Sequence, residues 1–156
     1  MNAPVIVRVQ REDFDLDAEV SALRRERSDI GAVVTFSGLC RDEAGALSAL
    51  ELEHYPGMAE AEIERICHEA LERFGLQAAT AIHRFGKITP GENIVLVIAA
   101  SPHRQAAFDG ANFIMDFLKT SAPFWKKEHH VDGSIGEWVS AKDADDAARD
   151  RWTRKP

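Results

Sequence analysis

The stretch IVLVIAASPHRQAAFDGANFIMDFL, residues 94–118, decides the fold, because a strand pattern gives way within it to a helix pattern. Its first seven residues are apolar and rich in β-branched side chains, which is typical of a buried strand. Ser101 is expected to cap the following helix, with Pro102 at its first position and Pro123 ending it. The sequence therefore predicts a buried strand that leads directly into an amphipathic helix. The apolar residues of that helix recur at helical spacing: Ala107, Ala111, Ile114, Met115 and Leu118.

A second strand pattern lies just before this stretch. It covers residues 79–85, and the turn residues Thr89, Pro90, Gly91 and Glu92 join it to the buried strand. We expect the two strands to belong to one sheet.

Two more helices and several strands fill the rest of the chain. One helix is expected after Asp15, which serves as its N-cap, and another over residues 63–74, with Gly75 as its C-cap. Asp132 and Gly133 predict the turn of a hairpin. The strands are expected at residues 6–10, 32–37, 47–54, 124–131 and 135–139.

The order and pattern of these elements indicate the fold class. Several strands alternate apolar with polar residues, as strands of half-solvated antiparallel sheets do. No repeat and no linker rich in Gly, Ser or Pro divides the chain of 156 residues. We therefore expect one α+β domain with a largely antiparallel sheet over residues 1–142. Residues 143–156 are expected to be a tail, frayed or forming a short helix.

Charge and composition exclude several classes of function. Lys and Arg total 19 against 26 Asp and Glu, which leaves a formal charge of -7. Such a chain has no overall field that attracts nucleic acid or anionic lipid, so neither is expected as a partner. An anionic small molecule would need a local basic cluster. No apolar run approaches the roughly 20 residues that span a bilayer, no secretory signal is recognisable and the two cysteines form no framework, so a cytoplasmic protein is expected.

Neither a metal nor a cofactor is expected from the motifs. The six histidines lack ligand spacing: His68-Glu69 has no second histidine one turn on, and the adjacent His129 and His130 point to opposite faces of a strand. The glycine-rich fingerprints of dinucleotide and P-loop sites are absent from the sequence.

The start of the long helix is a candidate anion site. The helix dipole favours acidic residues in the first turn, yet His103 and Arg104 stand there. With the free N–H groups of the helix, these side chains can bind an anion. The pattern is equally compatible with two exposed side chains that solvent screens.

Two lysines and a loop arginine are further candidates. Lys119 lies in the last turn of the same helix, where a lysine complements the C-terminal dipole, and that alone would account for most lysines at such a position. Lys126 faces a semi-buried space if Phe124 is turned inward, and solvent if Trp125 is the buried neighbour. Arg41 follows a predicted strand, where loops often present functional groups but where many arginines are simply solvated.

The two cysteines are interpreted as structural. Cys40, beside Arg41, has the neighbour that activates a thiol, but a half-buried filler at a strand end is the stronger interpretation. Cys67 lies on an apolar helix stripe and is expected in the core.

Five segments, in order, resemble a known family. They are GAVVTFSGLCR (31–41), LEHYPGM (52–58), HRFGKITPGE (83–92), SPHRQAAF (101–108) and FIMDFLKTSAPFWKKE (113–128). Together they closely resemble the large, catalytic subunits of molybdopterin synthase, the MoaE family, over roughly residues 5–142. The resemblance implies an α/β-hammerhead fold and a homodimer of large subunits, each holding one small ubiquitin-like sulfur carrier of the MoaD type in a heterotetramer.

The resemblance also implies a reaction. The carrier's C-terminal Gly-Gly tail, activated as a thiocarboxylate, enters the large subunit and delivers sulfur to cyclic pyranopterin monophosphate (precursor Z). Two transfers create the dithiolene of molybdopterin. The functional positions of the family match Arg41, His103, Arg104, Lys119 and Lys126 of this sequence.

Each matching residue is expected to have one task. Arg41, His103 and Arg104 would bind the substrate phosphate, and Lys119 would pair with the incoming thiocarboxylate. Lys126 would stabilise negative charge as the cyclic phosphate opens, or shuttle a proton. Phe36, Met115 and Pro123 are candidate apolar neighbours of the tail or pterin, or simply core.

One position departs from the family. An arginine is common near Lys142, where it reaches the neighbouring subunit's site, and lysine lacks its bidentate geometry. The competing hypothesis for the whole chain is a non-catalytic module that binds a phosphorylated metabolite or a protein tail. The presence of both lysines favours catalysis, because Arg41, His103 and Arg104 would suffice for binding phosphate.

Overall fold

The computed structural model describes residues 4–140. A four-stranded sheet forms its centre, in the order β1 (Val5–Gln10), β4 (Ala78–Arg84), β6 (Asn93–Ser101) and β2 (Ala32–Leu39). β1 runs parallel to β4, and the other pairs are antiparallel. The residues predicted to be a buried strand form β6, with both neighbours paired along its length.

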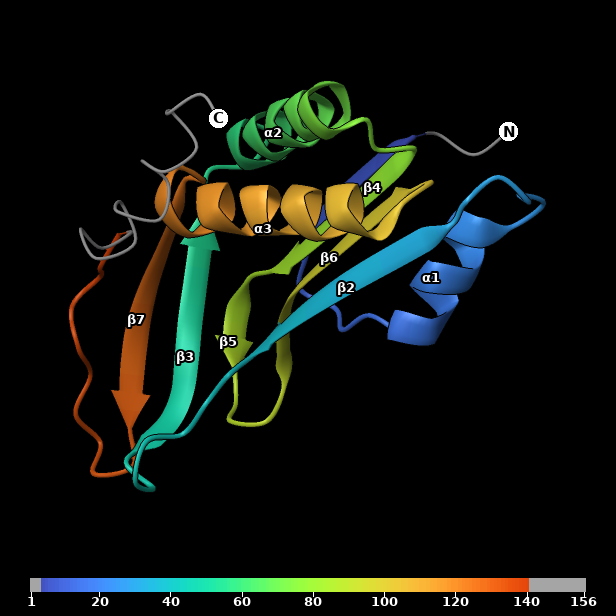
Figure 1. Cartoon of the computed structure of the whole chain (residues 1–156). Helices are drawn as coiled ribbons and strands as arrows, with labels where there is room; N and C mark the ends of the chain where they lie inside the picture. The colour runs from blue at the N-terminus through green and yellow to red at the C-terminus, as the bar shows by residue number, and fades with distance from the viewer. Residues whose placement is uncertain (1–3, 141–156) are drawn as a thin grey trace.

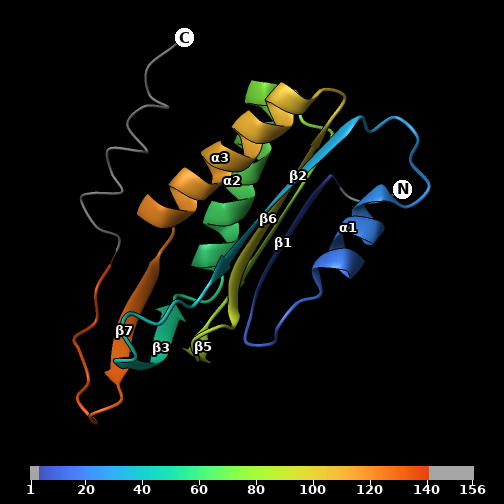
Figure 2. The same cartoon turned by 60° about the horizontal axis from the view of Figure 1, so that its bottom comes forward.

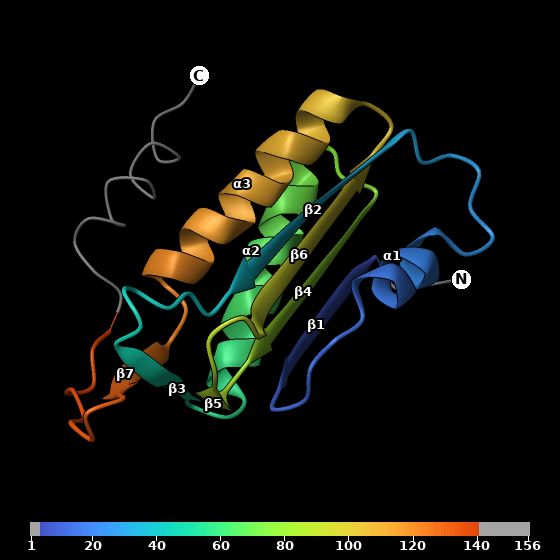
Figure 3. The same ribbon diagram turned by 90° about the horizontal axis from the view of Figure 1, so that it is seen from below.

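Helices cover both faces of this sheet, and the alternation of side chains explains which helix lies where. α2 (Met58–Phe74) and α3 (Arg104–Thr120) lie on one face, and α1 (Leu16–Arg24) on the other (Figures 1 and 3). Ala79, Ala81, Val95, Val97 and Ala99 pack in the cluster that includes the apolar residues of α2 and α3. The alternate residues of β4 and β6 pack with Leu23 and Val20 of α1. Burial on both faces accounts for the nearly continuous apolar run of β6.

A second, three-stranded antiparallel sheet extends the domain at one end. Its order is β5 (Gly86–Ile88), β3 (Leu47–His54) and β7 (Phe124–His130). It lies near the end of α3 where that helix leads into β7 (Figures 1 and 2). Cys40, Leu52 and Ile88 form a small buried cluster there. The predicted α+β class with largely antiparallel sheets is confirmed.

Several predicted boundaries agree with the structure. β3 has the predicted bounds, the Asp15 carboxylate accepts a hydrogen bond from the backbone N of Ala18, and Gly75 ends α2 with a left-handed backbone at φ 69°. α2 begins at Met58, earlier than the predicted 63. The strand β5 was not predicted because its three residues are too few for a recognisable period.

The predicted start of α3 is wrong. Ser101 is the last residue of β6, paired with Ala32, and the N-cap of α3 is His103, with Arg104 as the first helical residue. The Ser101 hydroxyl donates to the backbone O of His103 instead of capping a helical N–H. Strand pairing thus kept Ser101 and Pro102 out of the helix.

The predicted hairpin after α3 is only partly formed. Its first strand is β7, but the returning segment pairs through two isolated bridges, Lys126 with Val139 and His129 with Ile135. The proposed tail, 143–156, and Lys142 lie outside the described residues. Among the described residues, none of the helices is long and apolar enough to cross a membrane.

Candidate functional site

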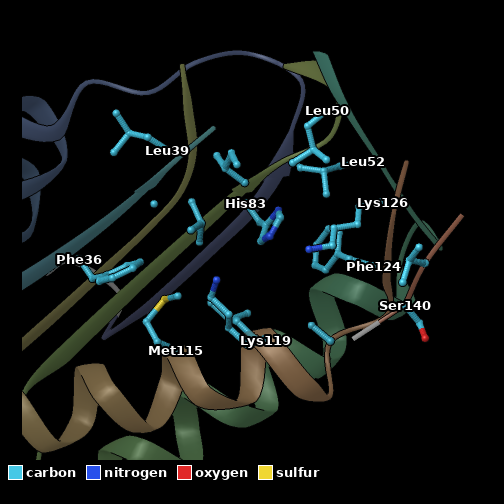
Figure 4. Close-up of a pocket in the computed structure, with 16 residues that line it drawn as sticks. Phe36, Leu39, Leu50, Leu52, His83, Met115, Lys119, Phe124, Lys126 and Ser140 are labelled. Carbon is cyan, nitrogen blue, oxygen red and sulfur yellow. The ribbon is translucent and has the colours of Figure 1, made fainter. Parts of the chain in front are cut away.

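A cavity of about 190 Å³ lies between the two sheets and the C-terminal half of α3. Its wall combines residues from six elements, which explains why no single segment of sequence reveals it (Figure 4). Most of the lining is apolar, and three nitrogen-bearing side chains face it: His83, Lys119 and Lys126. The other labelled lining residues are Phe36, Leu39, Leu50, Leu52, Met115, Phe124 and Ser140.

A glycine in β2 leaves room for the cavity. Gly38 lines it, opposite Val95 of β6 in the sheet register. A Cβ at residue 38 would lie 2.7 Å from Cγ1 of Val95 and 3.4 Å from the Phe36 ring. Any larger residue would therefore push against this part of the wall.

Lys119 reaches the cavity from the last turn of α3. It follows Met115 by four residues, so both side chains lie on one face of the helix, and both line the cavity (Figure 4). The dipole explanation and a functional one are compatible here, because the helix end that favours a cation also opens on the cavity.

Lys126 reaches the same cavity from β7. Phe124 and Lys126 both line it, as in the alternative in which Phe124 is turned inward, but Lys126 is itself exposed and not in a semi-buried space. Trp125 packs edge-on against Tyr55, with ring centroids 5.1 Å apart, away from this lining. Lys127 places its ammonium 4.5 Å from the centre of the Trp138 ring. Successive side chains of β7 point to opposite faces of the strand, so Lys126 and Lys127 lie on different sides.

Arg41 does not line the cavity. It lies two residues beyond Leu39, a lining residue, and its side chain is 81% exposed. Its guanidinium donates to the Glu43 carboxylate at 2.7 Å. An exposed pair of this kind contributes little to stability, so the guanidinium is available to another anion.

His103 and Arg104 also lie away from the cavity. Both are exposed at the N-terminus of α3, and His103 makes no side-chain capping bond. Arg104 stands 15 residues before Lys119 in one continuous helix, a separation of about 22 Å at the ordinary helical rise. Within one chain, the five predicted basic residues therefore do not converge: Lys119 and Lys126 share a cavity, and the other three do not reach it.

The position of this helix end depends on Gly31. Its backbone N donates to Ser101 O at 3.1 Å, and a Cβ at residue 31 would lie 2.0 Å from the carbonyl oxygen of Pro102. Only glycine permits this approach, which holds the residues just before His103 against β2.

His83 is a site residue that was not predicted. It lies on the α3-facing side of β4, in line with Ala79 and Ala81, and its side chain enters the cavity (Figure 4). Burial, with Lys119 and His54 nearby, lowers its pKa to about 4, so the imidazole is neutral at neutral pH. A histidine that continues an apolar face of a strand was the available signal.

Both cysteines are buried, as interpreted from the sequence. Burial raises the pKa of the Cys40 thiol and raises that of Cys67 to about 12. Neither thiol therefore has the character of a nucleophile at neutral pH. Cys40 Sγ lies 3.7 Å from the backbone O of Ile88, inside the small cluster of the second sheet.

Comparisons with known proteins give a consistent result. The sequence model of the family described as "MoaE protein" matches residues 9–121. The molybdopterin synthase catalytic subunit of Rhizobium meliloti (strain 1021) is 88% identical over 155 residues, covering 99% of this chain and 100% of the relative. Among solved structures, the molybdopterin biosynthesis MoaE protein from Burkholderia ambifaria MC40-6 superposes with a TM-score of 0.83 at 45% identity, covering 97% of this chain and 99% of that one. Molybdopterin synthase from Staphylococcus aureus gives 0.75 at 28% identity, covering 85% and 95%.

Proposed function

The chain belongs to the MoaE protein family, and from this premise we propose that it is the catalytic subunit of a molybdopterin synthase. In this role it is a sulfurtransferase of molybdenum cofactor biosynthesis. It transfers sulfur from the C-terminal thiocarboxylate of a small MoaD-type carrier to precursor Z, and two such transfers form the dithiolene. No cofactor enters this proposal, and the cytoplasm is the proposed location.

The observation that carries the proposal is the cavity shared by Lys119 and Lys126. Two ammonium groups from different elements face an otherwise largely apolar space, and both side chains are also exposed to solvent, so an incoming anion can reach and pair with them. At about 190 Å³ the cavity is smaller than the roughly 300–1,000 Å³ of sites that enclose a drug-sized ligand. A space of this size suits a narrow chain end such as a Gly-Gly tail.

The two lysines divide the work in this proposal. Lys119 pairs with the thiocarboxylate and so fixes the sulfur near the substrate. Lys126 faces the same space from the opposite element and stabilises the negative charge that develops on the substrate, or transfers a proton to it. Phe36 and Met115 supply apolar contact surface beside the two lysines.

Arg41, His103 and Arg104 are proposed to bind the substrate phosphate. Because Arg104 lies about 22 Å along α3 from Lys119, one substrate molecule does not reach both in a single chain. We therefore place His103 and Arg104 at the cavity of the second chain of the proposed homodimer. Each large subunit of that dimer also holds one carrier, which gives a heterotetramer.

Reconstitution tests this function. The purified chain is mixed with thiocarboxylated carrier and precursor Z, and molybdopterin is measured. Product formation supports the proposal, whereas bound precursor without product indicates the non-catalytic module. Lys119→Ala is the decisive variant: we expect turnover to fall by about 100-fold or more, in line with the loss of a group that stabilises a reacting anion. Near-normal turnover would show that Lys119 does not position the sulfur.

A further inference from the structure

His83 lines the cavity, and its hydrogen bonding determines which ring nitrogen can accept a hydrogen bond. Its Nδ1 lies 2.8 Å from the backbone O of Arg84. A carbonyl oxygen can only accept, so Nδ1 carries the proton in this contact. The neutral ring then has Nε2 as an unprotonated acceptor. Within residues 4–140, no side chain or backbone group makes a hydrogen bond to that nitrogen.

The ring is held in place by aromatic contacts. It lies on the Phe124 ring with centroids 3.9 Å apart and planes inclined by 19°. His54 of β3 extends the aromatic contacts: its ring centroid lies 4.5 Å from that of Phe85 and 6.0 Å from that of Phe124. A stacked, hydrogen-bonded imidazole has little freedom to turn, so its acceptor keeps one direction.

Burial is the main cause that keeps His83 neutral, and nearby charges add to it. Lys119 from α3 and His54 from β3 both disfavour a second positive charge, and burial acts in the same direction. Lys126 faces the same cavity from β7. The cavity therefore contains two groups that only donate hydrogen bonds and one imidazole that accepts.

This arrangement matches a ligand that carries a donor next to an anion. The lysines pair with the negative groups and leave His83 Nε2 as the acceptor between the two sheets, while the hydroxyl of Ser140 lies at an exposed position. Two ligands of the proposed reaction have this character. A C-terminal tail has a peptide N–H beside its terminal carboxyl group, and a reduced pterin has ring N–H groups.

We infer that His83 is a ligand-binding residue whose Nε2 accepts a hydrogen bond from an N–H group of the carrier tail or of the pterin. This inference rests on the proposed function and adds an acceptor to a site otherwise described by cations. It assigns His83 no proton transfer, and it requires the ring to stay neutral so that Nε2 can accept.

Two substitutions distinguish the effect of the hydrogen-bond acceptor from the effect of the stacked ring. His83→Phe keeps a flat ring against Phe124 but has no acceptor, and His83→Gln keeps an acceptor at a similar distance from the backbone. His68→Gln, at an exposed position of α2, is the matched control. For each variant, calorimetry gives the Kd of the carrier, and steady-state assays with saturating thiocarboxylated carrier give KM for precursor Z.

We expect His83→Phe to raise one of these constants by about three- to tenfold, the effect of one neutral hydrogen bond. A change in carrier Kd identifies the tail amide as the donor, and a change in KM identifies the pterin. His83→Gln, which restores an acceptor, is expected to raise the same constant less than His83→Phe does, and His68→Gln is expected to stay within about twofold of the unchanged protein. Unchanged constants in His83→Phe, or equal defects in His83→Phe and His83→Gln, would overturn the inference.

A spectroscopic test needs no variant and no turnover. Nitrogen-15 spectra of the histidine-labelled full chain are expected to show His83 protonated at Nδ1 and unprotonated at Nε2. Addition of carrier or of precursor Z is expected to shift the Nε2 signal. The opposite tautomer, or no shift with either ligand, contradicts the inference. Absence of molybdopterin formation together with a shifted Nε2 signal would contradict the proposed function and leave the His83 contact standing.

Discussion

The imidazole of His83 lies on the phenyl ring of Phe124, with centroids 3.9 Å apart and planes inclined by 19°. His83 belongs to β4 of the four-stranded sheet and Phe124 to β7 of the three-stranded sheet. The contact therefore joins the two sheets beside the cavity that Lys119 and Lys126 also line. A change in the relative position of the sheets would alter the site directly.

The adjacent lysines of β7 provide a matched pair. We expect Lys126→Ala to lower kcat by about 100-fold, because the reacting anion loses a charge-assisted partner. Lys127→Ala removes an equal charge one residue away, at a side chain that lies over Trp138 and not in the cavity. It is expected to leave kcat within about twofold. Steady-state molybdopterin formation is the measurement, and equal losses in both variants would contradict the separation of roles.

A mixed dimer tests whether His103 and Arg104 act on the partner's cavity. Lys119→Ala and Arg104→Ala chains, each expected to be inactive as homodimers, are co-expressed with different tags and the mixed dimer is isolated. If Arg104 serves the partner, one of the two sites combines an unchanged Lys119 with an unchanged Arg104. We expect the mixed dimer to have about half of the activity of a dimer of unchanged chains, because one of its two sites is intact.

The alternative arrangement predicts an inactive mixed dimer. If each chain supplied both residues to its own site, both sites of the mixed dimer would be damaged and it would remain inactive. A mixed dimer of two Lys119→Ala chains with different tags controls for the isolation procedure.

The lowered pKa of His83 predicts a pH dependence of stability. Its folded-state pKa of about 4 lies below the ordinary histidine value of 6.5, so the unfolded chain takes up the proton first as the pH falls. Stability is therefore lost as the pH falls from about 6.5 toward 4. Between pH 6.5 and 5 the loss is about 2 kcal/mol in the free energy of unfolding.

Urea unfolding of the unchanged protein and of His83→Gln measures this loss. The variant is expected to have a flatter pH profile by that amount. The range above pH 5 avoids carboxyl groups such as Glu51, whose pKa is lowered by its hydrogen bond with His129 and which loses its stabilising effect in more acidic solution. Parallel profiles for the two proteins would show that His83 titrates normally.

Gly38 predicts the effect of narrowing the cavity. In Gly38→Ala the new Cβ would lie 2.7 Å from Val95 Cγ1, so the wall has to shift. We expect a loss of about 1–3 kcal/mol in the free energy of unfolding and weaker binding of the carrier. Gly136→Ala is the control, because its Cβ meets no atom closer than 3.7 Å. Urea unfolding and calorimetry measure both quantities, and a Gly38→Ala protein with unchanged stability and carrier affinity would contradict the packing argument.

The sequence predicted local structure better than the site. Asp15 and Gly75 were assigned correctly because capping depends on a few neighbouring residues. The start of α3 was misplaced because pairing of Ser101 with Ala32, residues far apart in sequence, decided between strand and helix. Local patterns contain no information about that pairing.

The same limit applies to the site residues. Lys119 and Lys126 were identified from the resemblance, but their common cavity depends on packing of α3 against both sheets. His83 lay in one of the quoted segments and was missed, because its place on the apolar face of a strand indicates burial but does not show that a cavity opens beside it. Arg104 and Lys119 lie far apart because α3 is one continuous helix. The sequence predicted this helix, and its length alone shows that the two side chains cannot meet at one site of the same chain.

The length of α3 constrains how this protein can vary. Arg104 stands at its first position and Lys119 in its last turn, and in the proposed dimer these residues serve different cavities. One residue inserted between them would displace one end by about 1.5 Å and turn it by about 100°. Both catalytic centres of the dimer would then lose a contact through a single event. Relatives are therefore expected to exchange side chains on the exposed face of α3 freely while keeping the number of residues between its two ends.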